Sequence, residues 1–264
     1  MVDFEIKEKY DIHDLLKIME ILRGENGCPW DREQDHHSIR MNFLEEVYEA
    51  CDAIDNEDDA NLKEELGDVL QQIVFHSRIA EERDSFNFDD VANDVCVKLI
   101  TRHPHIFSDV TVKDSDEVLD NWDKIKLKEK GSTNYRTEME RVPKALPALM
   151  YSEKIQKRAK KAGFDWPDVN GALEKVTEET AEVIEAINGG GDVFEEIGDL
   201  LFAVVNVARF CHVDPEDALY KASAKFKKRF AYVEEKAGEN MKNMSLEELD
   251  RLWDEYKKTG GKNE

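Results

Sequence analysis

The sequence predicts an all-α protein built from two tandem, duplicated helical-bundle domains. Apolar residues recur at helical spacing through most of its 264 residues. No segment shows the sustained alternation of apolar and polar residues that marks a strand. One ordered pattern of acidic, basic and tryptophan residues occurs twice, and two copies are too few for a solenoid. We therefore expect duplication of a single helical domain.

Apolar periodicity and turn residues divide the first half into helices. A stretch rich in Gly and Pro ends the first predicted helix and opens a loop at residues 28–31. Ser38 is expected to cap the second helix, and a polar turn at residues 56–60 separates it from the third. Pro104 closes the fourth helix. The expected helices cover residues 11–24, 38–54, 62–74, 88–102 and 117–130.

Residues 131–147 form the predicted linker between a first helical domain, residues 1–130, and a second, residues 148–264. The linker contains glycine, serine and proline and shows no sustained period. In the second domain, Gly189–Gly191 is expected to turn the chain between two helices, and Ser245 to cap the last one. The expected helices there cover residues 149–162, 173–188, 193–210, 215–237 and 246–258.

Composition limits the classes of function. The formal net charge of -23 disfavours binding to nucleic-acid backbones or anionic membranes, because phosphate affinity needs clustered Lys and Arg. A small phosphorylated ligand stays compatible, since a local cationic cluster and a metal ion invert the local field. The segment Met1–Tyr10 is too charged for a signal peptide, and no apolar run approaches the ~20 residues that span a bilayer. The four cysteines are scattered, which fits reduced thiols. We expect a soluble cytoplasmic protein.

Each copy of the repeat begins with four acidic residues at a spacing typical of metal ligands. Side chains three residues apart share one side of a helix, so each copy places two acids on one helix and two on the next. A short connection makes these helices antiparallel neighbours. Four ionised carboxylates held together repel one another, and a hard divalent cation would relieve that repulsion. The acids are Glu46, Glu49, Glu65 and Asp68 in the first copy and Glu179, Glu182, Glu196 and Asp199 in the second.

The residue types favour Mg²⁺, with Mn²⁺ as an alternative ion. Di-iron carboxylate bundles use Glu-x-x-His on two helices, whereas the fourth positions here are Glu and Asp. Ligation by oxygen alone therefore disfavours iron. A solvated surface is the ordinary interpretation of any single acidic pair on a helix. The recurrence of the complete set, with the same residues after it, favours a site.

The residues that follow the acids are also repeated. A carboxylate-bound Mg²⁺ commonly recruits substrate phosphates as its remaining ligands. A Lys and an Arg one helical turn apart would pair with the other phosphate oxygens, and a Trp offers a flat face on which a base can stack. Each copy has a Lys–Arg pair and then a Trp–Lys pair: Lys98, Arg102, Trp122 and Lys126 in the first, Lys225, Arg229, Trp253 and Lys257 in the second.

The chain resembles the MazG family of nucleoside triphosphate pyrophosphohydrolases in its two-domain form. The resemblance rests on the acidic pattern and on three further segments, CPWD at residues 28–31, RHPHIF at 102–107 and KFKKRF at 225–230. It covers nearly the whole chain and implies tandem four-helix-type domains, usually assembled as a homodimer. It also implies Mg²⁺-dependent hydrolysis of a nucleoside triphosphate to a monophosphate and pyrophosphate. Spacing alone would predict only a metal–carboxylate site for a phosphate.

The resemblance also assigns roles in the second half. It implies that the four acids there are the metal ligands and that Lys225, Arg229 and Trp253 contact the substrate, with Lys257 as an addition. Glu178, beside the ligand Glu179, is a candidate base.

One position separates the two halves. Lys175 lies one helical turn before Glu179 and is expected to reach a phosphate, whereas the neutral Asn42 takes the corresponding place in the first half. In related two-domain members the carboxy-terminal domain is the better-supported catalytic one. We therefore expect the second half to be catalytic, and the first set to bind weakly or to serve assembly. A non-catalytic nucleotide-binding protein with the same fold is the alternative. No residue near Trp253 selects one base, so broad specificity is expected.

Overall fold

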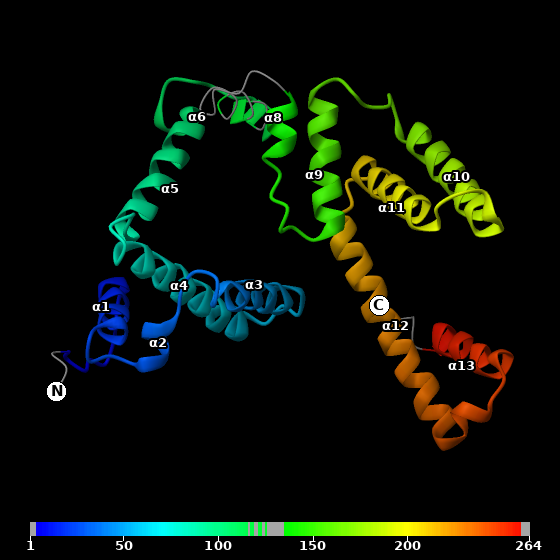
Figure 1. Ribbon diagram of the computed structural model, residues 1–264, viewed down its shortest axis with the longest axis horizontal. Coiled ribbons are helices and arrows are strands. Elements are labelled where there is room, and N and C mark those ends of the chain that lie inside the picture. The colour runs from blue at the N-terminus through cyan, green and yellow to red at the C-terminus, as the bar shows by residue number, and fades with distance from the viewer. Residues whose placement is uncertain (1–3, 116, 119–120, 123–124, 126–134, 260–264) are drawn as a thin grey trace. The chain divides into compact units, whose positions relative to one another are not determined.

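The computed structural model describes residues 4–115, 117–118, 121–122, 125 and 135–259, and every regular element within these residues is a helix. The all-α prediction is confirmed. The chain divides into two compact units, residues 1–129 and 130–264 (Figure 1). Within the described part of the chain, none of the helices combines the length and the apolar character needed to cross a membrane.

The first unit is organised around a helical hairpin. α3 (Arg40–Asp55) and α4 (Asp59–Glu81) pair with each other, and α1 (Ile12–Arg23) packs on α4 (Figure 1). The turn between α3 and α4 is short, so the two helices are antiparallel neighbours. Asp58 fixes the start of α4, because its carboxylate accepts hydrogen bonds from the backbone N–H groups of the first turn. Other helices of this unit that the described residues define in full are α2 (Pro29–Glu33), α5 (Phe88–Arg102) and α6 (Pro104–Phe107).

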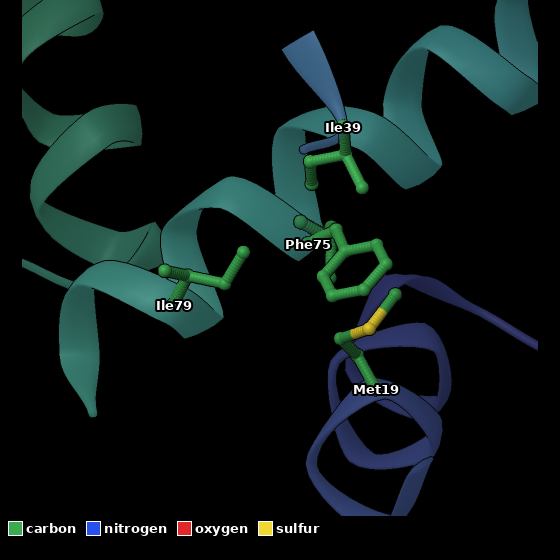
Figure 2. Packing of buried hydrophobic residues seen from close by; sticks show 5 residues of the cluster. Met19, Ile39, Phe75 and Ile79 are labelled. Carbon is green, nitrogen blue, oxygen red and sulfur yellow. The ribbon is translucent and has the colours of Figure 1, made fainter. Parts of the chain in front are cut away.

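The core of the first unit lies where α1 meets α4. Figure 2 shows Phe75 of α4 between Met19 of α1 and Ile39, which precedes α3, with Ile79 one turn further along α4. These side chains are almost completely buried. Burial of large apolar side chains stabilises a fold by about 1.5–3 kcal/mol each, so this cluster holds the hairpin and α1 together.

The second unit repeats this arrangement. α10 (Val169–Glu185) and α11 (Val193–Phe210) form the hairpin, and α9 (Ala148–Lys161) packs on α11 as α1 packs on α4. The chain reverses through a π-helical turn, η1 (Ala186–Gly190), in which Gly189 has a φ of 97°. Glycine adopts that left-handed conformation without steric cost, so the turn predicted here is confirmed. The other elements are α8 (Tyr135–Glu140), α12 (Pro215–Ala237), η2 (Gly238–Asn243) and α13 (Leu246–Thr259).

Three predicted helix starts are wrong. α4 begins at Asp59 rather than at residue 62, because the Asp58 carboxylate caps its first turn. The Ser38 hydroxyl donates to the carbonyl of Asp35 and closes the preceding turn, so Ile39 is the N-terminal boundary of α3 and makes no side-chain cap. α10 begins at Val169 rather than at residue 173, because the Asp168 carboxylate accepts a hydrogen bond from the backbone N–H of Asn170.

Two segments predicted to be irregular contain short helices. Residues 28–31 overlap α2, which has Pro29 at its first position, where the missing N–H of proline costs nothing. α8 lies inside the segment 131–147 that was predicted as a linker. Both helices are too short to show a helical period in the sequence. Most of the helix predicted at residues 117–130 lies outside the described residues.

Candidate functional site

The hairpin of the second unit brings acidic side chains together. Glu179 of α10 and Glu196 and Asp199 of α11 each offer a carboxylate oxygen within 4.8 Å of the others. The first hairpin forms a similar group from α3 and α4, whose members are Glu46, Glu49 and Glu65. Both groups combine acids from two helices, as the repeat predicts. Each triplet contains three of the four predicted ligands.

The fourth acid of each set lies close enough to interact with the triplet. A hydrogen bond between the carboxyl groups of Glu182 and Glu179 is the largest cause that raises the pKa of Glu182 above its ordinary value. In the first unit, partial burial and then the charge of Asp68 raise the pKa of Glu46. The pKa of Glu196 is raised in the same way, by partial burial and then by the charge of Glu179. These shifts follow from like charges held together, which a cation would relieve.

Lys175 partly neutralises the second cluster. Its Nζ lies 2.5 Å from Oε1 of Glu179 and 2.9 Å from Oε1 of Glu178. Hydrogen bonds to these two carboxylates raise the pKa of Lys175 above its ordinary value. The sequence placed Lys175 on the same helix face as Glu179, and the structure confirms that the two side chains meet.

Glu179 is the residue that best fits a metal ion. It is only 3% exposed, and its Oε2 is buried and accepts no hydrogen bond. A buried carboxylate oxygen without a partner costs free energy, and Lys175 satisfies only Oε1. A divalent cation held by Glu179, Glu196 and Asp199 would satisfy the other oxygen with hard oxygen ligands. The donor set therefore fits the predicted cofactor.

A cavity of about 740 Å³ opens beside this cluster. Glu179 and Asp199 line it together with residues from α8, α9, α11 and the loop between α9 and α10. Its size is within the range of small-molecule sites, and aromatic rings form part of its wall. Other residues of the wall are Gln156, Phe164, Trp166, Phe202, Asn206 and Arg209.

The loop that carries Trp166 is anchored to α11. Arg209 has a nearly buried side chain and pairs with Asp165 at 2.5 Å, while its Nε donates to Asn206 at 2.8 Å. Removing one partner of such a pair typically costs roughly 3–5 kcal/mol, because the other charge stays buried. Trp166 itself lies directly over Gly171 of α10, where a Cβ atom would stand 2.6 Å from Cγ of the indole ring. Glycine at position 171 thus permits this ring position.

The predicted substrate contacts of α12 and α13 form a separate cluster. The guanidinium of Arg229 lies 5.5 Å from the ring centre of Trp253, which also packs against Phe226. Lys257 pairs with Asp254 at 2.8 Å, and Lys225 is exposed. None of the four predicted contacts lines the cavity beside the acids. Their role toward the substrate stays a prediction.

The corresponding residues of the first half are only partly described. Lys98 is exposed on α5 and Arg102 is half-buried at its end. Trp122 packs edge-on against His103 at 4.8 Å between ring centres. Lys126 lies outside the described residues.

The two units differ on the helix face that carries the second pair of acids. Phe75 follows Asp68 by seven residues on α4, and Asn206 follows Asp199 by seven residues on α11. Seven residues are close to two helical turns, so each lies on the same face as the acid before it. Phe75 is buried against Met19 in the core (Figure 2), as its place in the buried cluster shows. Asn206, in contrast, lines the cavity. In the first unit, an aromatic ring therefore occupies the position at which the second unit has a polar cavity wall.

The sequence alone did not single out Gln156, Trp166 or Asn206. Gln156 sits in a helix rich in polar residues and shows no signal of its own. A comparison of the two copies could have found Asn206, because phenylalanine takes its place after the first acidic set.

The fold and the site define an all-α protein whose helical hairpins carry acidic clusters of metal-ligand type. Residues 34–107 and 169–234 match the MazG nucleotide pyrophosphohydrolase domain, and these two segments contain both acidic sets. The chain belongs to the MazG family, as the sequence motifs predicted, and the enzyme class is confirmed at the level of the family.

Several proteins are similar over nearly the whole chain. The nucleoside triphosphate pyrophosphohydrolase/pyrophosphatase MazG of Thermotoga maritima is 43% identical over 247 residues, which cover 92% of this chain and 94% of that protein. The nucleoside triphosphate pyrophosphohydrolase of Escherichia coli strain K12 is 42% identical over 255 residues, which cover 94% and 97%. Protein YabN of Bacillus subtilis strain 168 is 47% identical over 248 residues, which cover 92% of this chain and 50% of that protein.

Proposed function

We propose that this chain hydrolyses nucleoside triphosphates to nucleoside monophosphates and pyrophosphate, with broad base specificity, and that the second unit carries the reaction. The proposal rests on the environment of Glu179. Its Oε2 is buried without a partner beside Glu196 and Asp199, at the wall of a cavity large enough for a nucleotide. The names of the Thermotoga and Escherichia relatives support the reaction class.

The proposed cofactor is Mg²⁺, with Mn²⁺ as an alternative. Glu179, Glu182, Glu196 and Asp199 would hold it, and the bound ion would polarise phosphoryl oxygens and lower the pKa of the attacking water. Glu182 is included because its carboxyl group lies close enough to Glu179 for that residue to raise its pKa.

The remaining side chains bind and orient the substrate or accept a proton. Lys175 reaches the edge of the acidic cluster and supplies a positive charge to a phosphate there. Glu178 is exposed enough to take a proton from water at its carboxylate, and Lys175 holds that carboxylate in place. Contacts from α12 and α13 would pair with phosphate oxygens or pack on the nucleoside; they are Lys225, Arg229, Trp253 and Lys257.

The first unit is proposed as a second, inactive or weakly binding site. It retains the acids Glu46, Glu49, Glu65 and Asp68 and the basic and aromatic residues Lys98, Arg102, Trp122 and Lys126. Asn42 replaces the positive charge of Lys175, and Phe75 fills the place of Asn206. Both differences reduce what the site offers to a charged nucleotide.

We also propose that the chain forms a homodimer and works in the cytoplasm. An apolar stripe of Ile197, Leu201 and Val204 on α11 is about half exposed, and Leu66 and Leu70 repeat part of it on α4. Residues spaced three and four apart form one face of a helix, so each stripe is continuous. Contiguous exposed apolar surface of this kind is typical of a contact with another chain.

The experiment is a pyrophosphate-release assay with ATP and Mg²⁺ on the full chain. Glu179→Gln and Glu196→Gln are expected to lower kcat by about 100-fold or more, because each removes a charged ligand. Glu46→Gln is the matched control and is expected to keep most of the activity. Circular dichroism should show the same helix content in all variants.

Three results would contradict the proposal. Full turnover in both second-unit variants would remove the ligand assignment. Loss of turnover in Glu46→Gln alone would move the reaction to the first unit. Tight nucleotide binding by the wild-type protein without any pyrophosphate release would favour the alternative, a non-catalytic nucleotide-binding protein.

A further inference from the structure

We infer that the cavity of the second unit takes the nucleobase of the substrate, and that Gln156 orients this base by accepting a hydrogen bond from it. The inference rests on the proposed function and extends it, because it assigns a base site away from Trp253 and gives it one polar contact. Gln156 belongs to α9, which forms one wall of the cavity.

The orientation of the Gln156 amide is fixed by its surroundings. Its Nε2 donates to the backbone carbonyl of Phe202 at 2.8 Å. A carbonyl only accepts hydrogen bonds, so the NH₂ end of the amide must face Phe202 and the oxygen must face away. Gln156 therefore presents an acceptor, not a donor, to its remaining surroundings.

That acceptor has no partner in the protein. Gln156 is 6% exposed, and its Oε1 is buried without a hydrogen bond. Buried polar groups in native proteins are almost always paired, and an unpaired one needs an explanation such as an absent water, ion or ligand. Since Gln156 lines the cavity, a ligand within it can supply that donor.

The side chains of the cavity wall indicate a ligand with a flat ring attached to a phosphorylated group. Glu179 and Asp199 lie on the same wall, so a molecule whose phosphates meet the acidic cluster enters this space with its other end. Trp166 and Phe202 supply aromatic surface there, and stacking on such surface suits any base. The ion pair of Asp165 with Arg209 holds the loop that carries Trp166, so this part of the cavity wall has a fixed position.

The chemistry of the contact defines what it selects. A fixed acceptor favours the binding of a base that offers an N–H at its edge, such as an exocyclic amino group or a protonated ring nitrogen. It penalises a base with no such donor, because Oε1 then stays buried and unpaired. Purine riboside triphosphate is a suitable probe, since it differs from ATP only in lacking the amino group of the ring.

The experiment compares ATP with purine riboside triphosphate in the wild-type chain and in Gln156→Met. Methionine keeps the length of the side chain but removes both polar atoms, and the Phe202 carbonyl retains its hydrogen bond within α11. We expect the wild type to prefer ATP by about tenfold in kcat/KM and Gln156→Met to lose most of this preference through a higher KM for ATP. Turnover of purine riboside triphosphate should change little.

Two controls separate this contact from general damage. Gln72→Met makes the same substitution at a glutamine of the first unit that is equally buried, and it should retain the preference for ATP. Inhibition by inorganic tripolyphosphate, which has no base, should be the same in the wild type and in Gln156→Met. Thermal unfolding should confirm that both variants are folded.

The results distinguish the base site from the proposed reaction. An unchanged ATP preference in Gln156→Met overturns the inference while the reaction stands, and so does loss of the preference in Trp253→Ala alone. If the wild type releases no pyrophosphate, the proposed function fails. The base contact is then tested by calorimetric binding of the two triphosphates, where equal affinities in the wild type would overturn it.

Discussion

Glu179 and its neighbours illustrate how single residues in this chain combine burial with charge. Three negative side chains lie within 4.8 Å of one another, and one lysine compensates only part of that charge. The free energy of the native state is therefore raised by unrelieved repulsion in the absence of a cation. A ligand that binds only the folded protein stabilises it in proportion to the logarithm of its concentration.

We therefore predict that Mg²⁺ stabilises the protein through Glu179. At ~100 times its dissociation constant, one bound ion contributes about 2.7 kcal/mol to the free energy of unfolding. Mg²⁺ is expected to raise Tm in Glu46→Gln, where only the second cluster is intact, and not in the double variant Glu46→Gln/Glu179→Gln. Differential scanning calorimetry with and without a chelator checks this. An equal rise in the double variant would show that the ion binds elsewhere.

A histidine pair makes the first unit sensitive to pH. Nδ1 of His36 lies 2.8 Å from Nδ1 of His76, and the two rings stack. Burial is the largest cause that lowers the pKa of each histidine below its ordinary value, and the charge of Arg83 lowers that of His36 further, against Asp35. The unfolded chain therefore binds more protons than the folded chain in this range. Stability is then present above the ordinary histidine pKa of about 6.5 and is lost as pH falls below it.

The prediction is that the free energy of unfolding of the chain falls between about pH 7 and pH 5, and that the double variant His36→Phe/His76→Phe shows a flatter dependence. Urea unfolding at several pH values measures this slope. His13→Gln removes an exposed histidine of the same unit and should retain the wild-type slope. The same slope in the double variant would assign the pH dependence to other groups.

At the scale of elements, the loop between α9 and α10 decides the shape of the cavity. Trp166 lies over Gly171, and a methyl group at that position would overlap the indole ring. In an ordinary helix interior, alanine is more stable than glycine by roughly 0.5–1 kcal/mol. Glycine at position 171 therefore leaves space for the Trp166 ring, although alanine there would make α10 itself more stable.

We predict that Gly171→Ala displaces Trp166 and raises KM for ATP by about tenfold, the equivalent of one lost base–aromatic stack. Inhibition by tripolyphosphate should not change, since the acidic cluster is not affected. Tryptophan fluorescence reports the displacement, and nucleotide titration of steady-state rates reports KM. A variant with the wild-type KM and a higher Tm would show that the ring has no part in binding.

The elements that the sequence predicts well are those set by local spacing. Helical periodicity and a short turn are enough to place Glu179 beside Glu196, and the structure confirms that these acids meet. The cavity was not predictable in this way. Gln156 and the carbonyl that fixes it are 46 residues apart, so their contact depends on how α9 packs on α11. Ser38 failed as a cap for a related reason, because its hydroxyl has a competing partner in Asp35.

At the scale of the whole molecule, the exposed apolar stripes on α4 and α11 favour a contact with another chain. Leu201 of α11 is 51% exposed and Leu66 of α4 is 55% exposed, in equivalent stripes of the two hairpins. Within the described residues, α4 contacts α1, α3 and α5, and α11 contacts α9, α10 and α12, yet both stripes stay exposed beside these helices. Gly198 and Gly67 lie beside these stripes with open space around them, which leaves room for a close approach by another backbone.

The stripe on α11 is predicted to form the contact between two copies of the chain. A charge at its centre would have to be buried without a partner, so Leu201→Asp is expected to shift the protein from dimer to monomer, with a loss of at least about 100-fold in dimer affinity. Leu246→Asp is the matched control, since Leu246 is also exposed but stands alone at the start of α13. Sedimentation velocity over a range of concentrations separates the two states. A dimer that survives Leu201→Asp, or a wild type that is monomeric at micromolar concentration, would contradict this contact.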